Sequence, residues 1–164
     1  MRKLKIISYF CLSFVMVIGL MTIAASGGGG SGDTTTFSDN GGDICTEGGK
    51  PVIRMFSTST CPHCAWSAQA FDPVVQSYVN QGLIFAHHWE IDTGDDLLTS
   101  EVEDEVPASE MTVYNTYSPQ SYVPAFVFGC RYIRIGTGHE SSNDVEAEED
   151  EFIDLIEELL DSVP

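Results

Sequence analysis

Basic side chains are scarce in this 164-residue chain, which has 7 lysines and arginines against 25 aspartates and glutamates and a net charge of −18. A surface of that sign repels phosphate backbones, so a general nucleic-acid binder is excluded and we expect no nucleic-acid partner. Apolar content is not scarce. Hydrophobic residues make up 43% of the chain and aromatic residues 10%, which is enough to build a core and excludes disorder throughout. The length indicates one folded domain with accessory segments.

Lysine is nearly absent beyond the N-terminus, since Lys50 is the one lysine after residue 26. A net charge of this size destabilises a compact fold through self-repulsion unless salt screens it. The composition therefore suits a protein from a halophilic source. An ordinary acidic exported protein is the alternative.

Charge is missing altogether from Ile6 to Ala25, a run of 20 residues that follows three basic residues at the N-terminus. Its length favours a membrane anchor, whereas Ala24-Ala25-Ser26 resembles the cleavage site of a signal peptide. Both interpretations of residues 1–25 place the basic end inside and the rest of the chain outside. We therefore expect an extracytoplasmic protein, either secreted or tethered to the membrane by this segment.

The remainder divides by composition into a linker and a domain. Residues 26–43 contain seven glycines and are expected to form a flexible linker. Residues 44–164 are expected to form an α/β domain, because short apolar runs alternate with segments of helical periodicity. The predicted elements are a strand at 51–56, a helix at 65–80 that kinks or restarts at Pro73 with Asp72 as the N-cap, a strand at 83–91, a helix near 109–117, a β-hairpin at 125–135 and a helix at 144–162.

The sequence Cys61-Pro62-His63-Cys64 stands where the first predicted strand passes into the first helix. A thiolate, not a thiol, attacks a disulfide, and a helix N-terminus stabilises the charged form of a cysteine there. Cys61 is therefore the expected nucleophile, with a pKa below the free-thiol value of about 8.5. Cys64, one turn later, is the expected resolving thiol. His63 adds a hydrogen-bond donor or a positive charge near the sulfur and is the expected tuning residue.

This order of elements, with C-x-x-C at the first strand-to-helix junction, resembles the thioredoxin-like superfamily over residues 44–164. The Pro62-His63 dipeptide matches the bacterial disulfide oxidase DsbA, and Val123-Pro124 matches the cis-proline loop of the superfamily. The resemblance implies a central mixed β-sheet flanked by helices and a redox-active disulfide that exchanges with protein thiols. Pro62 and Pro124 would belong to the site, Pro124 shaping a substrate groove in which the backbone of Val123 pairs with an extended peptide. It implies an oxidase or isomerase, no cofactor and a redox partner of unknown identity.

Three features depart from that family. Its members carry a buried acid six residues before the first cysteine, and Met55 stands at this position. The proton of Cys64 must therefore pass to another acceptor, for which Glu90 and water are the candidates. The aromatic residue that often precedes the motif is replaced by Thr60. The segment before Val123 is also too short for the large helical insertion of DsbA, which indicates a compact domain.

The remaining cysteines suggest a second disulfide. In the thioredoxin fold the strand after the cis-proline runs antiparallel to the motif-bearing strand, so its far end returns to the start of that first strand. Cys11 lies in the N-terminal segment, which leaves Cys45 and Cys130 outside the motif. We predict a structural disulfide between them, remote from the motif. The alternative is a buried free thiol at Cys130 and a loose Cys45 in the linker.

Two other functions remain open. The first is a reductase that supplies electrons to thiols outside the cytoplasm. The second is a metal-binding module in which Cys61 and Cys64 act with His63 or His87, although a structural zinc site takes four ligands and there is no second C-x-x-C. We expect no metal site.

The other polar clusters are interpreted as surface. His87 and His88 lie next to each other in a strand, so their rings should point to opposite faces. His139 is expected in a surface loop. The acidic residues at 95–96, at 101–105 and at the start of the last helix (Glu146 and 148–151) are expected to be solvated.

Overall fold

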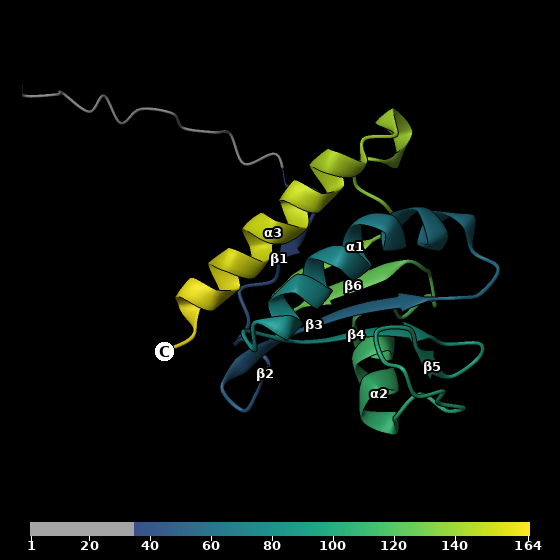
Figure 1. The fold of residues 1–164 in the computed structure, drawn as a ribbon, viewed down its shortest axis with the longest axis horizontal. Helices are drawn as coiled ribbons and strands as arrows, with labels where there is room; N and C mark the ends of the chain where they lie inside the picture. The colour runs from purple at the N-terminus through teal and green to yellow at the C-terminus, as the bar shows by residue number, and fades with distance from the viewer. Residues whose placement is uncertain (1–34) are drawn as a thin grey trace, which may run out of the picture. The chain divides into compact units, whose positions relative to one another are not determined.

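A computed structural model describes residues 35–164, which form a mixed α/β fold (Figure 1). The strands are β1 (Ser38–Asp39), β2 (Thr46–Glu47), β3 (Lys50–Ser57), β4 (Phe85–Glu90), β5 (Asp95–Asp96), β6 (Ala125–Phe128) and β7 (Tyr132–Ile135). The helices are α1 (Pro62–Asn80), α2 (Ala108–Tyr117), the 3-10 helix η1 (Glu140–Ser142) and α3 (Val145–Ser162). None of the helices in residues 35–164 is long and apolar enough to cross a membrane. The predicted signal or anchor at 1–25 lies outside the described residues.

The sheet is mixed, as expected, and β3 is its centre. The strand order is β1-β7-β6-β3-β4-β5, and β2 pairs with the start of β3. β3 runs parallel to β4 and antiparallel to β6. The crossover from β3 to β4 passes through α1, the connection that parallel neighbours require.

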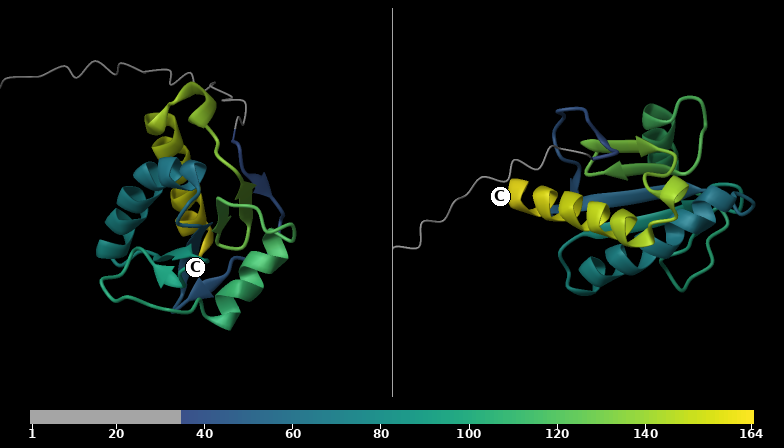
Figure 2. Two further views of the ribbon diagram at one scale, coloured as in Figure 1. Left: turned by 90° about the vertical axis from the view of Figure 1, so that its right-hand side faces the viewer. Right: turned by 90° about the horizontal axis from the view of Figure 1, so that it is seen from above.

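Helices cover both faces of the sheet (Figure 2). Ile53 and Met55 of β3 belong to the apolar cluster under α1 and α3, whereas Phe56 belongs to a second cluster with Tyr114 of α2. The three β3 side chains are fully buried. A strand buried on both faces reads as a continuous apolar run, which is why residues 51–56 lack polar alternation.

The folded unit begins before residue 44, which differs from the predicted linker boundary. Phe37 is only 5% exposed and packs against Phe126, Phe128 and Phe152. The short β1 follows it and pairs with β7. One buried aromatic ring with several aromatic neighbours is enough to dock a segment whose composition otherwise suits a linker. Residues 26–34 of the predicted linker lie outside the described residues.

Helix α1 is continuous from Pro62 to Asn80, without the restart expected at Pro73. A proline inside a helix removes one backbone hydrogen bond, here to the carbonyl of Gln69. Gln69 and Pro73 both lie on the exposed side of α1, so water can hydrogen-bond to the carbonyl of Gln69. Asp72, expected to cap a second helix, instead contacts His88 of β4 at 2.8 Å.

The acidic start of α3 is not fully solvated. Glu148 is completely buried and Glu151 is 9% exposed, whereas Glu146 is exposed. Arg134 of β7 donates to Glu151 at 2.9 Å and also to Glu148. His139 is half-buried and its Nε2 lies 3.4 Å from Glu151, so it belongs to this cluster rather than to an open surface loop. The guanidinium of Arg134 lies over three aromatic rings, those of Phe37, Phe126 and Phe152.

A disulfide joins Cys45 to Cys130, the pairing expected from the sequence, with 5.3 Å between the Cα atoms. The backbone N–H of Cys45 donates to the carbonyl of Gly129 at 2.8 Å, and the N–H of Gly129 donates to Val52 at 2.9 Å. Both Gly129 and Cys130 have positive φ, 58° and 59°, which turns the chain tightly between β6 and β7. The bond therefore ties the amino end of β3 to this turn.

Candidate functional site

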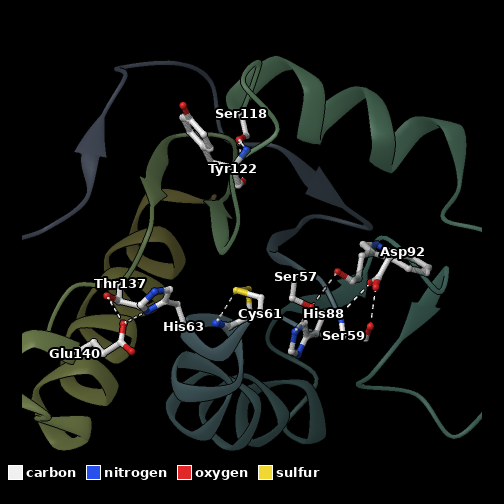
Figure 3. The surroundings of a disulfide bond; sticks show 12 residues. Ser57, Ser59, Cys61, His63, His88, Asp92, Ser118, Tyr122, Thr137 and Glu140 are labelled. Carbon is white, nitrogen blue, oxygen red and sulfur yellow. Dashed lines mark hydrogen bonds and ion pairs between the residues drawn. A yellow bond between two sulfur atoms is a disulfide. The ribbon is translucent and has the colours of Figure 1, made fainter.

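The two motif cysteines occupy the N-terminus of α1, four residues after β3 ends (Figure 3). Cys61 is the N-cap, and its sulfur accepts a hydrogen bond from the backbone N–H of Cys64 at 3.1 Å. The two form a disulfide with Cα atoms 5.2 Å apart. Cys61 is partly exposed and Cys64 is 3% exposed. One sulfur of the pair is therefore open to a partner and the other is sealed.

Pro62 is the first residue of the helix, where its missing N–H has no helical partner to lose. The loop before the motif is fixed by Asp92, whose carboxylate accepts hydrogen bonds from the hydroxyl and the backbone N–H of Ser59 at 2.6 and 2.9 Å. These two bonds, the hydroxyl first, lower the pKa of Asp92 below its ordinary value. The carboxylate therefore stays ionised beside the entrance to α1.

The predicted groove residues Val123 and Pro124 lie at the same end of the sheet as the motif. Their peptide bond is cis, and the next residue, Ala125, is paired with Phe56 near the carboxyl end of β3. The loop before them is closed by Ser118, whose hydroxyl accepts from the N–H of Tyr122 and donates to its carbonyl, each at 3.0 Å. The Val123–Pro124 peptide bond is thus held beside the carboxyl end of β3, the end that leads into the motif.

His63 points away from the helix toward η1 rather than standing free (Figure 3). Its Nδ1 lies 2.7 Å from Glu140, and the hydroxyl of Thr137 donates to the same carboxylate at 3.0 Å. The indole N–H of Trp66 also donates to the side chain of Asn143 at 3.2 Å. The first turns of α1 are therefore joined to the η1 region by two side-chain contacts. Sequence reasoning missed Glu140, since it lies 77 residues from His63.

His88 is a polar residue buried under α1, whereas the side chain of Glu90, a candidate proton acceptor together with water, bonds to the turn after its own strand. Glu90 accepts a hydrogen bond from Thr93 at 2.8 Å in the turn after β4. His88 is 2% exposed and its two ring nitrogens contact Asp72 and Ser57 at 2.8 and 2.9 Å. The sequence signal for this contact was the adjacent pair of histidines in a strand, one of which must point inward.

The geometry does not favour a metal module built on the motif. His87 pairs with Arg54 in the parallel register and shares its sheet face, the one that contacts α2 through Arg54 and Glu110. It therefore lies on the opposite face from α1, with its Nδ1 2.7 Å from Asp96. In residues 35–164 a group with metal-ligand spacing is His139, Glu148 and Glu151. Arg134 already forms ion pairs with both of those carboxylates.

Brief alkylation of the reduced protein near pH 6 is expected to label Cys61 before Cys64. Cys61 caps a 19-residue helix and is partly exposed, whereas Cys64 is buried. A helix N-terminus lowers the pKa of a cysteine and raises its thiolate fraction. Mass spectrometry of the digested protein locates the label, and preferential labelling of Cys64 contradicts the assignment.

The described site therefore consists of an exposed sulfur, a buried sulfur, a cis-proline loop and a buried histidine at one end of the sheet. Comparison of the chain with known protein families, with curated proteins and with solved structures identifies no match.

Proposed function

We propose that this protein is an extracytoplasmic thiol–disulfide oxidoreductase of the thioredoxin-like superfamily, acting on protein thiols. The observation that carries the proposal is the Cys61–Cys64 disulfide at the head of α1, with one sulfur exposed and the other buried. Such a pair can form a mixed disulfide with a partner through Cys61 and release it through Cys64.

The topology supports the family assignment. The core order β7-β6-β3-β4, with α1 and α3 on one face and α2 on the other, agrees with the resemblance drawn from the sequence. The cis bond between Val123 and Pro124, at the motif end of β3, agrees with it as well.

In the oxidising direction, a substrate thiolate attacks the sulfur of Cys61. A substrate–Cys61 disulfide forms, the Cys61–Cys64 bond breaks, and Cys64 leaves as a thiolate that takes up a proton. A second substrate thiolate then attacks the substrate sulfur, which releases the substrate disulfide and the thiolate of Cys61. The substrate loses two electrons and the cysteine pair gains them, so a separate oxidant must return the pair to its disulfide form.

The location outside the cytoplasm is supported by the Cys45–Cys130 disulfide, since structural disulfides persist in oxidising compartments. The fold brings Cys45 and Cys130 together, because the backbone N–H of Cys45 donates to the carbonyl of Gly129, the residue before Cys130. This agrees with the export or anchor signal expected in residues 1–25.

The reduction potential of the Cys61–Cys64 pair tests the function and its direction. We expect a value nearer about −120 mV than about −270 mV, because the helix N-terminus stabilises the thiolate and so the reduced form, and because the resemblance implies the same effect for the Pro62-His63 dipeptide. Equilibration with glutathione buffers of known ratio, followed by alkylation, gives the value. His63→Ala should lower the potential, and His87→Asn on the opposite sheet face should leave it unchanged.

The outcomes separate the candidate functions. A potential below the glutathione couple favours the reductase. A pair that does not exchange with glutathione at all contradicts the proposed function.

A further inference from the structure

We propose that Ser57, His88 and Asp72 form a proton relay that serves the buried thiol of Cys64. The inference rests on the proposed function and deepens it, because it names the groups that accept and return the proton during thiol–disulfide exchange. Cys64 is 3% exposed, so its proton has no direct route to water.

The three side chains form one hydrogen-bonded chain. Ser57 Oγ lies 2.9 Å from His88 Nε2, and His88 Nδ1 lies 2.8 Å from Asp72 Oδ1. Ser57 and His88 are each 2% exposed, whereas the side chain of Asp72 is 36% exposed. The chain therefore runs from the interior to solvent.

Strand register places this chain on the same sheet face as the motif helix. His88 is the parallel partner of Met55, and Met55 belongs to the cluster packed under α1 together with Cys64. Ser57 follows Met55 by two residues, so it shares that face and lies nearer the motif. His88 thus stands one strand away from Met55, the position where an acid was expected.

The neighbours of the His88 ring define its tautomer. Asp72 is an acceptor when ionised, so Nδ1 carries the proton and Nε2 accepts from the hydroxyl of Ser57. The alternative acceptor for Ser57, the carbonyl of Trp89, is farther away at 3.5 Å. The backbone N–H of His88 donates to Asp96 at 2.9 Å. Asp72 and Asp96 are the titratable groups bonded to His88 in the described chain, and its ring also packs edge-on against Phe71.

This arrangement moves one proton in each direction of the reaction. When Cys64 attacks the mixed disulfide at Cys61, it gives up its proton to the relay, in which Ser57 Oγ gains a proton while its own hydroxyl proton passes to His88 Nε2. The Cys64–Cys61 bond forms, the bond from Cys61 to the partner breaks, and the partner leaves as a thiolate. In the oxidising direction the same proton returns to the departing Cys64 thiolate.

A serine–histidine–aspartate chain also occurs in hydrolases, where the serine attacks the substrate. Ser57 is 2% exposed and lies beneath the loop and helix that carry the motif, so no substrate carbonyl reaches it. The burial that excludes hydrolysis is what a relay to a buried thiol needs.

The test is the lifetime of the mixed disulfide between Cys61 and glutathione. The reduced full-length chain is mixed with oxidised glutathione, quenched with acid at set times, and the mixed disulfide is measured by mass spectrometry. Ser57→Ala and His88→Phe are expected to slow its resolution by about 10²-fold at pH 7, the low end of general acid–base effects. In these variants the rate should rise about tenfold per pH unit, since only ionised Cys64 reacts, and should approach that of the unmodified protein at high pH.

His87→Phe is the matched control, because the ring of this neighbouring histidine lies on the opposite sheet face and contacts neither Ser57 nor Asp72. It should leave both the resolution rate and its pH dependence unchanged. Ser57→Ala removes a single atom, so it keeps the test open if His88→Phe does not fold. Resolution as fast in Ser57→Ala as in the unmodified protein, with the same pH dependence, overturns the relay alone. Failure of oxidised glutathione to convert Cys61 and Cys64 of the unmodified protein to their disulfide overturns the proposed function and the relay with it.

Discussion

Arg134→Met is expected to lower the free energy of unfolding by about 3–5 kcal/mol, the cost of breaking a buried ion pair from one side. Arg134 is 4% exposed, and its partners Glu148 and Glu151 are at most 9% exposed. Removing the cation leaves two buried carboxylates without their counter-charge. Methionine keeps much of the apolar contact with the three aromatic rings around the guanidinium, so the loss measured is mainly one of charge.

Urea unfolding at pH 7 and constant salt measures this loss. Arg131→Met is the matched control, because this arginine precedes the same strand but pairs with an exposed carboxylate, that of Asp39 at 2.8 Å. It should cost far less than Arg134→Met, because solvent screens an exposed ion pair. Equal losses in the two variants would show that the buried cluster contributes no more than a surface pair.

The effect of Arg134→Met should shrink in acid. Burial raises the pKa of Glu151, but hydrogen bonds from Thr36 and Thr35 and the charge of Arg134 outweigh it and hold the pKa below 4.5. A carboxylate with a lowered pKa contributes stability above its unfolded pKa and loses it as the pH falls through its folded pKa. The difference between the two proteins should therefore narrow below about pH 4.5, which unfolding curves at pH 7 and pH 3.5 would detect.

Replacing Cys45 and Cys130 together by alanine is expected to cost about 4–5 kcal/mol of stability in the chain-entropy description. The bond spans 85 residues of sequence, and its Cα separation of 5.3 Å lies within the ordinary range for a disulfide. The double replacement Cys61→Ala with Cys64→Ala is the matched control, because that bond spans only 3 residues and removes far less entropy from the unfolded chain.

Urea unfolding without reductant gives both values, and peptide mapping under the same conditions identifies the bond. The helix N-terminus stabilises the thiolate of Cys61 and so the reduced form of its pair, so the Cys45–Cys130 bond should also resist concentrations of reductant that open Cys61–Cys64. Alkylation of Cys45 in the native oxidised protein would contradict the pairing.

Local signals in the sequence were enough to predict where the motif lies and which helix follows it. A proline directly after Cys61 suits the first position of a helix, and an apolar run before the motif suits a buried strand. The pairing of Cys45 with Cys130 also followed, because the direction of the hairpin relative to β3 leaves few other arrangements. These inferences needed only neighbours in sequence or one strand pairing.

The contacts that sequence reasoning missed are non-local and specific to side chains. Phe37 is a lone aromatic in a glycine-rich segment, with no periodicity to indicate that it is buried. Asp72 before a proline looked like a helix cap, and its partner His88 comes from the next strand. Glu148 sits in an acidic run of the kind that is usually solvated, and only the position of Arg134 on β7 makes its burial favourable.

The central strand carries a covalent tie at each end, and the two ties differ in the length of chain that they close. The tie near its amino end joins residues 85 apart in sequence, whereas the tie beyond its carboxyl end joins residues 3 apart at the start of α1. Opening the second tie alone leaves the first in place, so fraying at the motif end does not spread along β3. A protein built this way can pass through repeated rounds of reduction and reoxidation while one end of its central strand stays locked.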